Sequence, residues 1–124
     1  MKPSYTGWRH LVHSTHYSFK GLKAAFLNEA AFRQELGICA LLLPFAWWIG
    51  ETPVEWILLV GSCAFVLIVE LLNSAVETVV DRIGPEHHVL SGRAKDIGSA
   101  AVMLSLIMAG LTWGLLLWQR LHGG

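Results

Sequence analysis

The sequence predicts an all-α integral membrane protein with three transmembrane helices and an N-terminal amphipathic helix on the membrane surface. Of its 124 residues, 54% are hydrophobic and only 15% are charged, whereas in a soluble domain about a quarter of the residues are charged. Three runs, residues 36–50, 56–69 and 97–119, contain no charged side chain. The composition excludes a water-soluble monomer, and the balance of nine basic and nine acidic residues argues against nucleic-acid binding.

An amphipathic surface helix is predicted over about residues 6–26. Its apolar side chains fall in a stripe about 100° wide, which is typical of a helix that lies on a surface. We expect the helix to lie in the cytoplasmic interface of the membrane, and packing against protein is the alternative. The stripe consists of Trp8, Leu11, Val12, Thr15, Phe19, Leu22 and Phe26.

Three spanning helices are predicted over about residues 29–50, 53–83 and 92–120. At ~1.5 Å per residue the first is about 33 Å long, which is enough for a hydrocarbon core of about 30 Å. The second is about 45 Å long and must protrude or tilt. Together the helices form a single membrane domain over residues 1–124.

Helix-boundary residues support these ranges. Thr52 suits an N-cap, Pro53 suits the first helical position, and Glu55 completes a capping box. Residues 84–85, Gly-Pro, predict the end of the second span. Residues 91–92, Ser-Gly, are expected to open the third.

Basic residues predict the orientation in the membrane. Residues 1–35 contain five Lys and Arg residues and the 81–96 loop contains three, whereas the 51–55 turn contains none. The positive-inside rule therefore places the N-terminus and the 81–96 loop in the cytoplasm and the C-terminus on the opposite, periplasmic side.

Ionisable side chains inside the second span indicate a functional site, because each costs about 2.5–3.5 kcal/mol in hydrocarbon on insertion scales. Glu70, Asn73, Glu77 and Asp81 fall within about 60° of one another on a helix and must face protein or a water-filled cleft. Glu70 and Glu77 are about 10 Å apart along the axis, too far to share one cation directly. Glu29 is the acid available to complete a metal site with Glu77. The alternative is a polar seam that only holds helices together.

These residues alone predict a carboxylate-lined, metal-binding cleft at the cytoplasmic side, with the deep Glu70 suited to general acid–base chemistry. They name no reaction, and the glycine-rich phosphate-binding loops of nucleotide-binding folds are absent. Residues 94–98 and 110–114 each space two small residues four apart, which permits close helix packing.

Three segments resemble the signature of the prokaryotic diacylglycerol kinases. They read NEAAFRQE at residues 28–35, VELLNSAVE with VDRI at 69–83, and LSGRAKDIGSAA at 90–101. The resemblance implies a homotrimer of three-span subunits in the bacterial inner membrane, with active sites between subunits. It also implies transfer of the γ-phosphate of MgATP to the primary hydroxyl of diacylglycerol, which gives phosphatidic acid.

The resemblance assigns roles to individual residues. Glu70 is implied as the base that takes the proton of the lipid hydroxyl, and Glu29 and Glu77 as ligands of the nucleotide-bound Mg²⁺. Asn73 and Asp81 are expected to support the site. The residues implied at the nucleotide are Tyr17, Glu29, Glu77, Glu86, His87, His88, Lys95 and Asp96. The residues implied at the acceptor lipid are Glu35, Trp48, Glu70, Ser99 and Trp113.

One position departs from the family pattern, and other functions stay open. Close relatives carry Arg where this chain has His10, and we expect Arg9 to replace it at the nucleotide. An Arg9→Ala variant with unchanged ATP affinity would contradict that expectation. The alternatives are an undecaprenol kinase of the same family, a non-enzymatic oligomer that conducts ions or protons, and a purely structural subunit.

Overall fold

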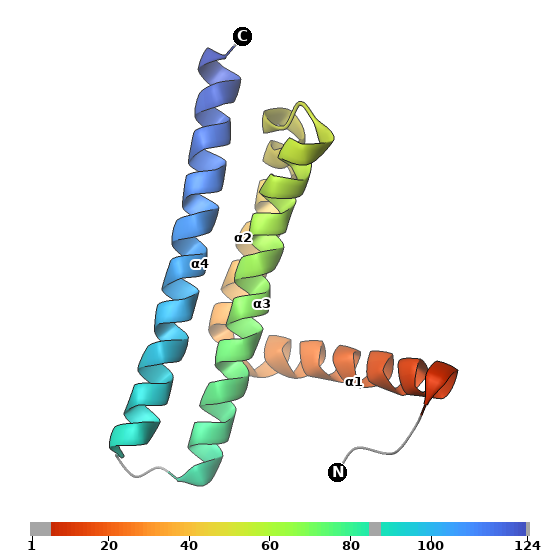
Figure 1. Ribbon diagram of the computed structural model, residues 1–124, viewed down its shortest axis with the longest axis vertical. Coiled ribbons are helices and arrows are strands. Elements are labelled where there is room, and N and C mark those ends of the chain that lie inside the picture. Colours follow the sequence, from red (N-terminus) through yellow and green to blue (C-terminus); the bar gives the residue numbers. More distant parts are fainter. Residues whose placement is uncertain (1–5, 85–87, 124) are drawn as a thin grey trace.

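The computed structural model describes residues 6–84 and 88–123. These residues form four α-helices, which confirms the all-α fold class: α1 (Gly7–Asn28), α2 (Ala30–Ile49), α3 (Pro53–Ile83) and α4 (Val89–His122). Helices α2, α3 and α4 run along one another, whereas α1 projects sideways from the end where α2 begins (Figure 1). The main contact is between α3 and α4, and α2 packs chiefly on α3.

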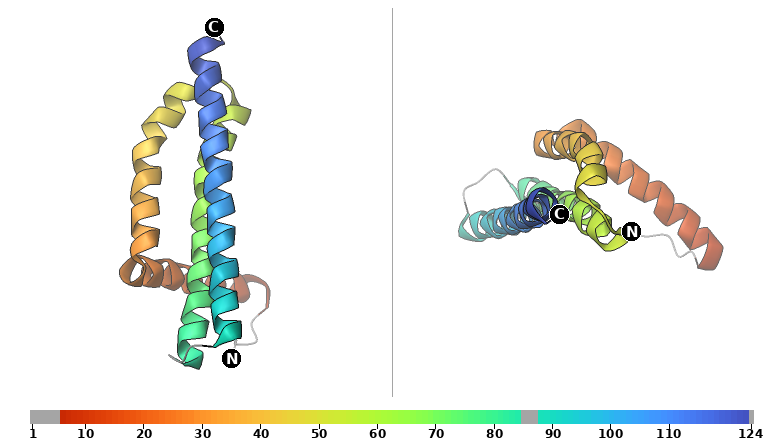
Figure 2. Two further views of the ribbon diagram at one scale, coloured as in Figure 1. Left: turned by 90° about the vertical axis from the view of Figure 1, so that its left-hand side faces the viewer. Right: turned by 90° about the horizontal axis from the view of Figure 1, so that it is seen from above.

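The apolar stripe of α1 does not pack on the rest of the described chain. Trp8 is 76% exposed and Phe19 is 67% exposed, and Ala25 is the buried residue of this helix. Viewed along the bundle, α1 extends away from the other three helices (Figure 2). The stripe is therefore free to face a membrane or another subunit.

The turn between α2 and α3 has the Thr52 cap and the Pro53 start that the sequence predicts, but Glu55 bonds the Glu51 amide where a capping box would bond that of Thr52. The Thr52 hydroxyl accepts a hydrogen bond from the Glu55 amide at 3.2 Å, and Pro53 begins the helix. The Glu55 carboxylate in turn accepts from the Glu51 amide at 3.2 Å. Helix α2 contains Pro44, which has no amide hydrogen to donate. This helix bends in its second half (Figure 2).

Helix α4 begins earlier than the sequence predicts. It starts at Val89, because the His88 Nδ1 atom accepts a hydrogen bond from the Leu90 amide at 3.0 Å and so caps the helix. The prediction that residues 91–92 open this helix is wrong. At the other end of the loop, α3 ends at Ile83 and Gly84 is its C-cap, as predicted.

A small core fixes the end of the bundle that is remote from α1. It contains Ala46, Ile49 and Leu59, against which Trp113 packs. The Trp113 indole Nε1–H lies 3.2 Å from the Leu59 carbonyl oxygen and 3.1 Å from the Ser62 hydroxyl oxygen, and donates to both. This bifurcated hydrogen bond holds α4 against α3.

Within the described residues, α3 and α4 are long and apolar enough to cross a membrane. Many of their large apolar side chains point outward, for example Ile57 at 69% and Leu115 at 67% exposed. Such extended apolar surface is typical of contact with lipid or with another subunit. Helix α2 is not one of these two helices, and Arg33, Gln34 and Glu35 interrupt the apolar sequence in its first two turns.

Candidate active site

The polar residues of α3 form a graded stripe from the bundle interior towards the α3–α4 turn. Glu70 is 5% exposed, Asn73 and Glu77 are half-buried, and Asp81 is exposed. The prediction that the stripe faces protein is thus confirmed at its deep end. The shallow end of the stripe is exposed at the α3–α4 turn.

Glu70 of α3 and Glu35 of α2 form a pair of neighbouring carboxyls in the interior of the bundle. The Ser74 hydroxyl, also buried, donates to Glu70 Oε2 at 3.5 Å. The Glu35 carboxyl of α2 is close enough to interact with that of Glu70, and Glu35 Oε2 is buried with no hydrogen-bond partner among the described residues. Two adjacent carboxyls in an apolar bundle are costly, and such groups commonly mark functional sites.

An open groove of about 850 Å³ lies between α1 and α3 beside this pair. Glu29 borders it from the corner between α1 and α2, and Ser74 borders it from α3. Ser74 also contacts Glu70, so one side chain, that of Ser74, links the groove to the buried carboxyl. The wall that α1 contributes is made of small and polar residues together with Leu22, namely Ser18, Gly21, Leu22, Ala24, Ala25 and Asn28.

The donor set fits a nucleotide-bound divalent cation better than a metal held by protein alone. Across residues 6–84 and 88–123, no three His, Cys, Asp or Glu side chains come together as a metal cluster. Glu29 and Glu77 are both half-buried, and neither carboxylate has a partner within those ranges. Mg²⁺ is commonly bound by one or two carboxylates together with substrate phosphates and water. Two open carboxylates therefore suit MgATP, although only Glu29 borders the groove.

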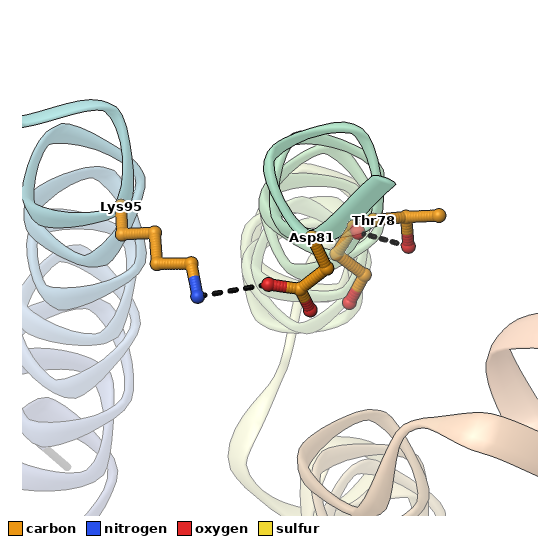
Figure 3. Close-up of polar contacts among 4 residues, drawn as sticks. Thr78, Asp81 and Lys95 are labelled. Atoms are coloured by element: carbon orange, nitrogen blue, oxygen red, sulfur yellow. Dashed lines mark hydrogen bonds and ion pairs between the residues drawn. The ribbon is translucent and has the colours of Figure 1, made fainter. Parts of the chain in front are cut away.

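Lys95 reaches across from α4 to α3. Its ammonium Nζ lies 3.0 Å from Asp81 Oδ1, with the two side chains 45% and 69% exposed respectively. Figure 3 shows this ion pair beside Thr78. The contact places a cation at the shallow end of the stripe.

The other residues implied at the nucleotide are spread over the chain. His88 and Asp96 border a separate groove of about 580 Å³ at the start of α4, together with Arg93. Successive residues of a helix point in different directions, so Asp96 faces away from the ion pair of Lys95. Tyr17 is 51% exposed on α1, and Glu86 and His87 lie outside the described residues.

Two of the residues implied at the lipid border one cavity. Glu35 and Trp113 both border an apolar cavity of about 230 Å³ between α2, α3 and α4. Ser99 is exposed on α4, and Trp48 is at the far end of α2, where the Arg120 guanidinium lies 5.2 Å from its ring centroid. Thirteen residues of helix separate Glu35 from Trp48, which is about 20 Å. A single chain therefore gathers only part of the expected lipid site.

Ser74, which donates to Glu70, was not among the predicted site residues. The signal was available, because residues four apart lie on the same face of a helix. The position of Glu35 beside Glu70 depends on how α2 packs on α3, and no local pattern in the sequence encodes that register.

Comparison with known proteins places the chain in one family. The sequence profile of the prokaryotic diacylglycerol kinase family matches residues 16–117. A diacylglycerol kinase of Haemophilus influenzae is 56% identical over 109 residues, which are 88% of this chain and 92% of the relative. That of Escherichia coli K12 is 52% identical over 97% of this chain and 98% of the relative, and that of Pseudomonas aeruginosa is 44% identical over 90% and 91%. The chain belongs to the prokaryotic diacylglycerol kinase family.

Proposed function

We propose that this protein transfers the γ-phosphate of ATP to the primary hydroxyl of diacylglycerol at the cytoplasmic membrane face and so makes phosphatidic acid. The observation that carries the proposal is Glu70, a carboxyl buried in an apolar bundle beside a groove. The relatives named diacylglycerol kinase align along nearly the whole chain, which supports the same lipid acceptor.

Glu70 acts as the base in this proposal. It accepts the proton of the lipid hydroxyl while that oxygen attacks the γ-phosphorus and the bond to the β-phosphate oxygen breaks. A lipid alcohol enters from the bilayer and reaches a side chain at this depth without leaving apolar surroundings. The Ser74 hydroxyl donates to the base from one helical turn further along α3, and the Glu35 carboxyl lies close to it on α2.

Glu29 and Glu77 would hold Mg²⁺ together with the phosphates of ATP. When bound, Mg²⁺ would neutralise charge on the β- and γ-phosphates, which is the main requirement of phosphoryl transfer. Lys95 adds a protein cation at the same exposed end of the stripe. It lies in the second turn of α4.

We infer that the complete enzyme is a homotrimer of three-span subunits in the bacterial inner membrane, with each active site shared between subunits. Trp48 lies about 20 Å along α2 from Glu35, so a neighbouring subunit would be needed to bring such a residue to the site. The exposed apolar side chains of α3 and α4 offer surface for that assembly. The N-terminus and the α3–α4 turn would be cytoplasmic and the C-terminus periplasmic.

Phosphate transfer from radiolabelled ATP to defined lipids tests the proposal. Purified protein with Mg²⁺ should label diacylglycerol, and preferential labelling of undecaprenol would instead assign the other acceptor. Glu77→Gln should raise the Mg²⁺ concentration needed for half-maximal rate by about tenfold, since one of two protein ligands is weakened. Glu51→Gln, an exposed acid in the opposite turn, should leave it unchanged. Ion flux without phosphate transfer would favour the conducting oligomer.

A further inference from the structure

The corner between α1 and α2 leaves backbone groups without helical partners. Glu29 connects the two helices in an extended conformation, with φ −118° and ψ 105°. Its amide donates to the Ala25 carbonyl at 2.8 Å, which is the last helical hydrogen bond of α1. The next carbonyls, those of Phe26 and Leu27, can no longer accept from amides four residues further on.

The Arg33 side chain satisfies these carbonyls. It reaches back across the corner and donates from Nη1 to the Phe26 carbonyl at 2.7 Å and to the Leu27 carbonyl at 3.3 Å. A cation at the C-terminal end of α1 also interacts favourably with the helix dipole. Arg33 thus joins the first two turns of α2 to the last turn of α1.

This arrangement leaves the Glu29 carboxylate open. Glu29 and Arg33 are four residues apart, a spacing at which an acid and a base commonly form an ion pair. No such pair forms in the part of the chain that the structure describes, because the guanidinium is turned towards the carbonyls. Glu29 instead borders the groove between α1 and α3.

We propose that Arg33 is a positioning residue for the kinase reaction: by clamping the end of α1 it fixes the corner at which Glu29 faces the groove. This inference rests on the proposed function, since it assigns Glu29 to the nucleotide-bound cation. Helix α1 makes most of its contacts in the described structure with α2. The clamp therefore decides the direction of α1 and the position of Glu29 relative to α3.

Kinetics of Arg33 variants test this role. Arg33→Ala should raise the KM for MgATP by about tenfold with a smaller change in kcat, since misplacement of a binding group by about 1 Å is enough for such losses. Arg33→Lys, which keeps a cation of similar reach, should recover most of the affinity. Arg120→Ala is the matched control, because Arg120 also donates to a backbone carbonyl, that of Trp48, at the other end of α2. It should leave the KM for MgATP unchanged.

A distance measurement separates the clamp from the reaction. Spin labels at positions 20 and 83, in a Cys39→Ser/Cys63→Ser background, report the separation of α1 and α3. Arg33→Ala should broaden their distance distribution and Arg33→Lys should narrow it again. A wild-type distribution and KM in Arg33→Ala would overturn the inference. If Arg33→Ala broadens the distribution but the wild-type protein transfers no phosphate, the proposed function fails while the clamp stands.

Discussion

Replacement of Gly98 by alanine tests the close approach of α3 and α4. A Cβ atom at Gly98 would collide with Asn73 Oδ1 and lie 3.1 Å from Asn73 Cγ. Asn73 is half-buried, and its Oδ1 has no partner among the described residues, so this side chain or the helix must move. Overpacking costs about 1–3 kcal/mol, whereas alanine otherwise gains about 1 kcal/mol over glycine inside a helix. We expect a net loss of up to about 2 kcal/mol in the free energy of unfolding.

Reversible unfolding in detergent measures this loss. Gly110→Ala is the control, because an added Cβ there meets no atom of the described residues within 4 Å, and it should be neutral or stabilising. Asn73→Ala removes the colliding atoms, so in the Asn73→Ala background Gly98→Ala should cost about 1–2 kcal/mol less. Equal effects of Gly98→Ala and Gly110→Ala, or strict additivity with Asn73→Ala, would refute the reasoning.

Three further substitutions test single contacts: Lys95→Met by stability and activity, and Trp113→Phe and Thr52→Ala by stability alone. Lys95→Met should change the free energy of unfolding by less than about 1 kcal/mol, because its partner Asp81 is exposed. Phosphate transfer, followed with labelled ATP, should nevertheless fall about 100-fold, because a cation near the phosphates is lost. Trp113→Phe removes the indole donor to α3 and should destabilise by about 1–2 kcal/mol in detergent unfolding, whereas Trp118→Phe, at an exposed indole, should not. Thr52→Ala removes the α3 cap and should cost about 1 kcal/mol in the same assay.

Local patterns in the sequence predicted most of the helical architecture. Thr52, Pro53 and Glu55 specify the start of α3 through contacts between residues only a few positions apart. The predicted start of α4 was wrong because histidine is an uncommon N-cap. The His88 Nδ1 atom accepts the hydrogen bond that a shorter, oxygen-bearing side chain usually accepts.

Packing between helices could not be predicted in the same way. Gly98 and Gly110 lie in similar small-residue spacings, yet of these two only Gly98 would meet a close neighbour among the residues that the structure describes. Glu29 and Arg33 have the spacing of an ion pair, but the break between α1 and α2 presents carbonyls that the guanidinium binds instead. These outcomes depend on which surfaces the fold brings together.

The polar stripe of α3 was predictable because ionisable side chains are rare and costly inside a membrane-spanning helix. The periodicity placed Glu70 and Asn73 on one face, and the burial of Glu70 bears this out. The partners of that face, Glu35 and Ser74, emerged only from the packed structure. Ser99 and Trp48 remain apart in one chain, and their roles at the lipid stay predictions.

Substitution of glutamine for the buried carboxyl at position 70 tests the central claim most directly. Glu70→Gln has nearly the same shape, so the purified variant should keep its helical content and its oligomeric state in detergent. Formation of phosphatidic acid from diacylglycerol and MgATP should fall by about 10²–10⁴-fold, the range over which a general base contributes. A folded Glu70→Gln protein that makes phosphatidic acid at the wild-type rate would contradict the assignment of the base and of the site around it.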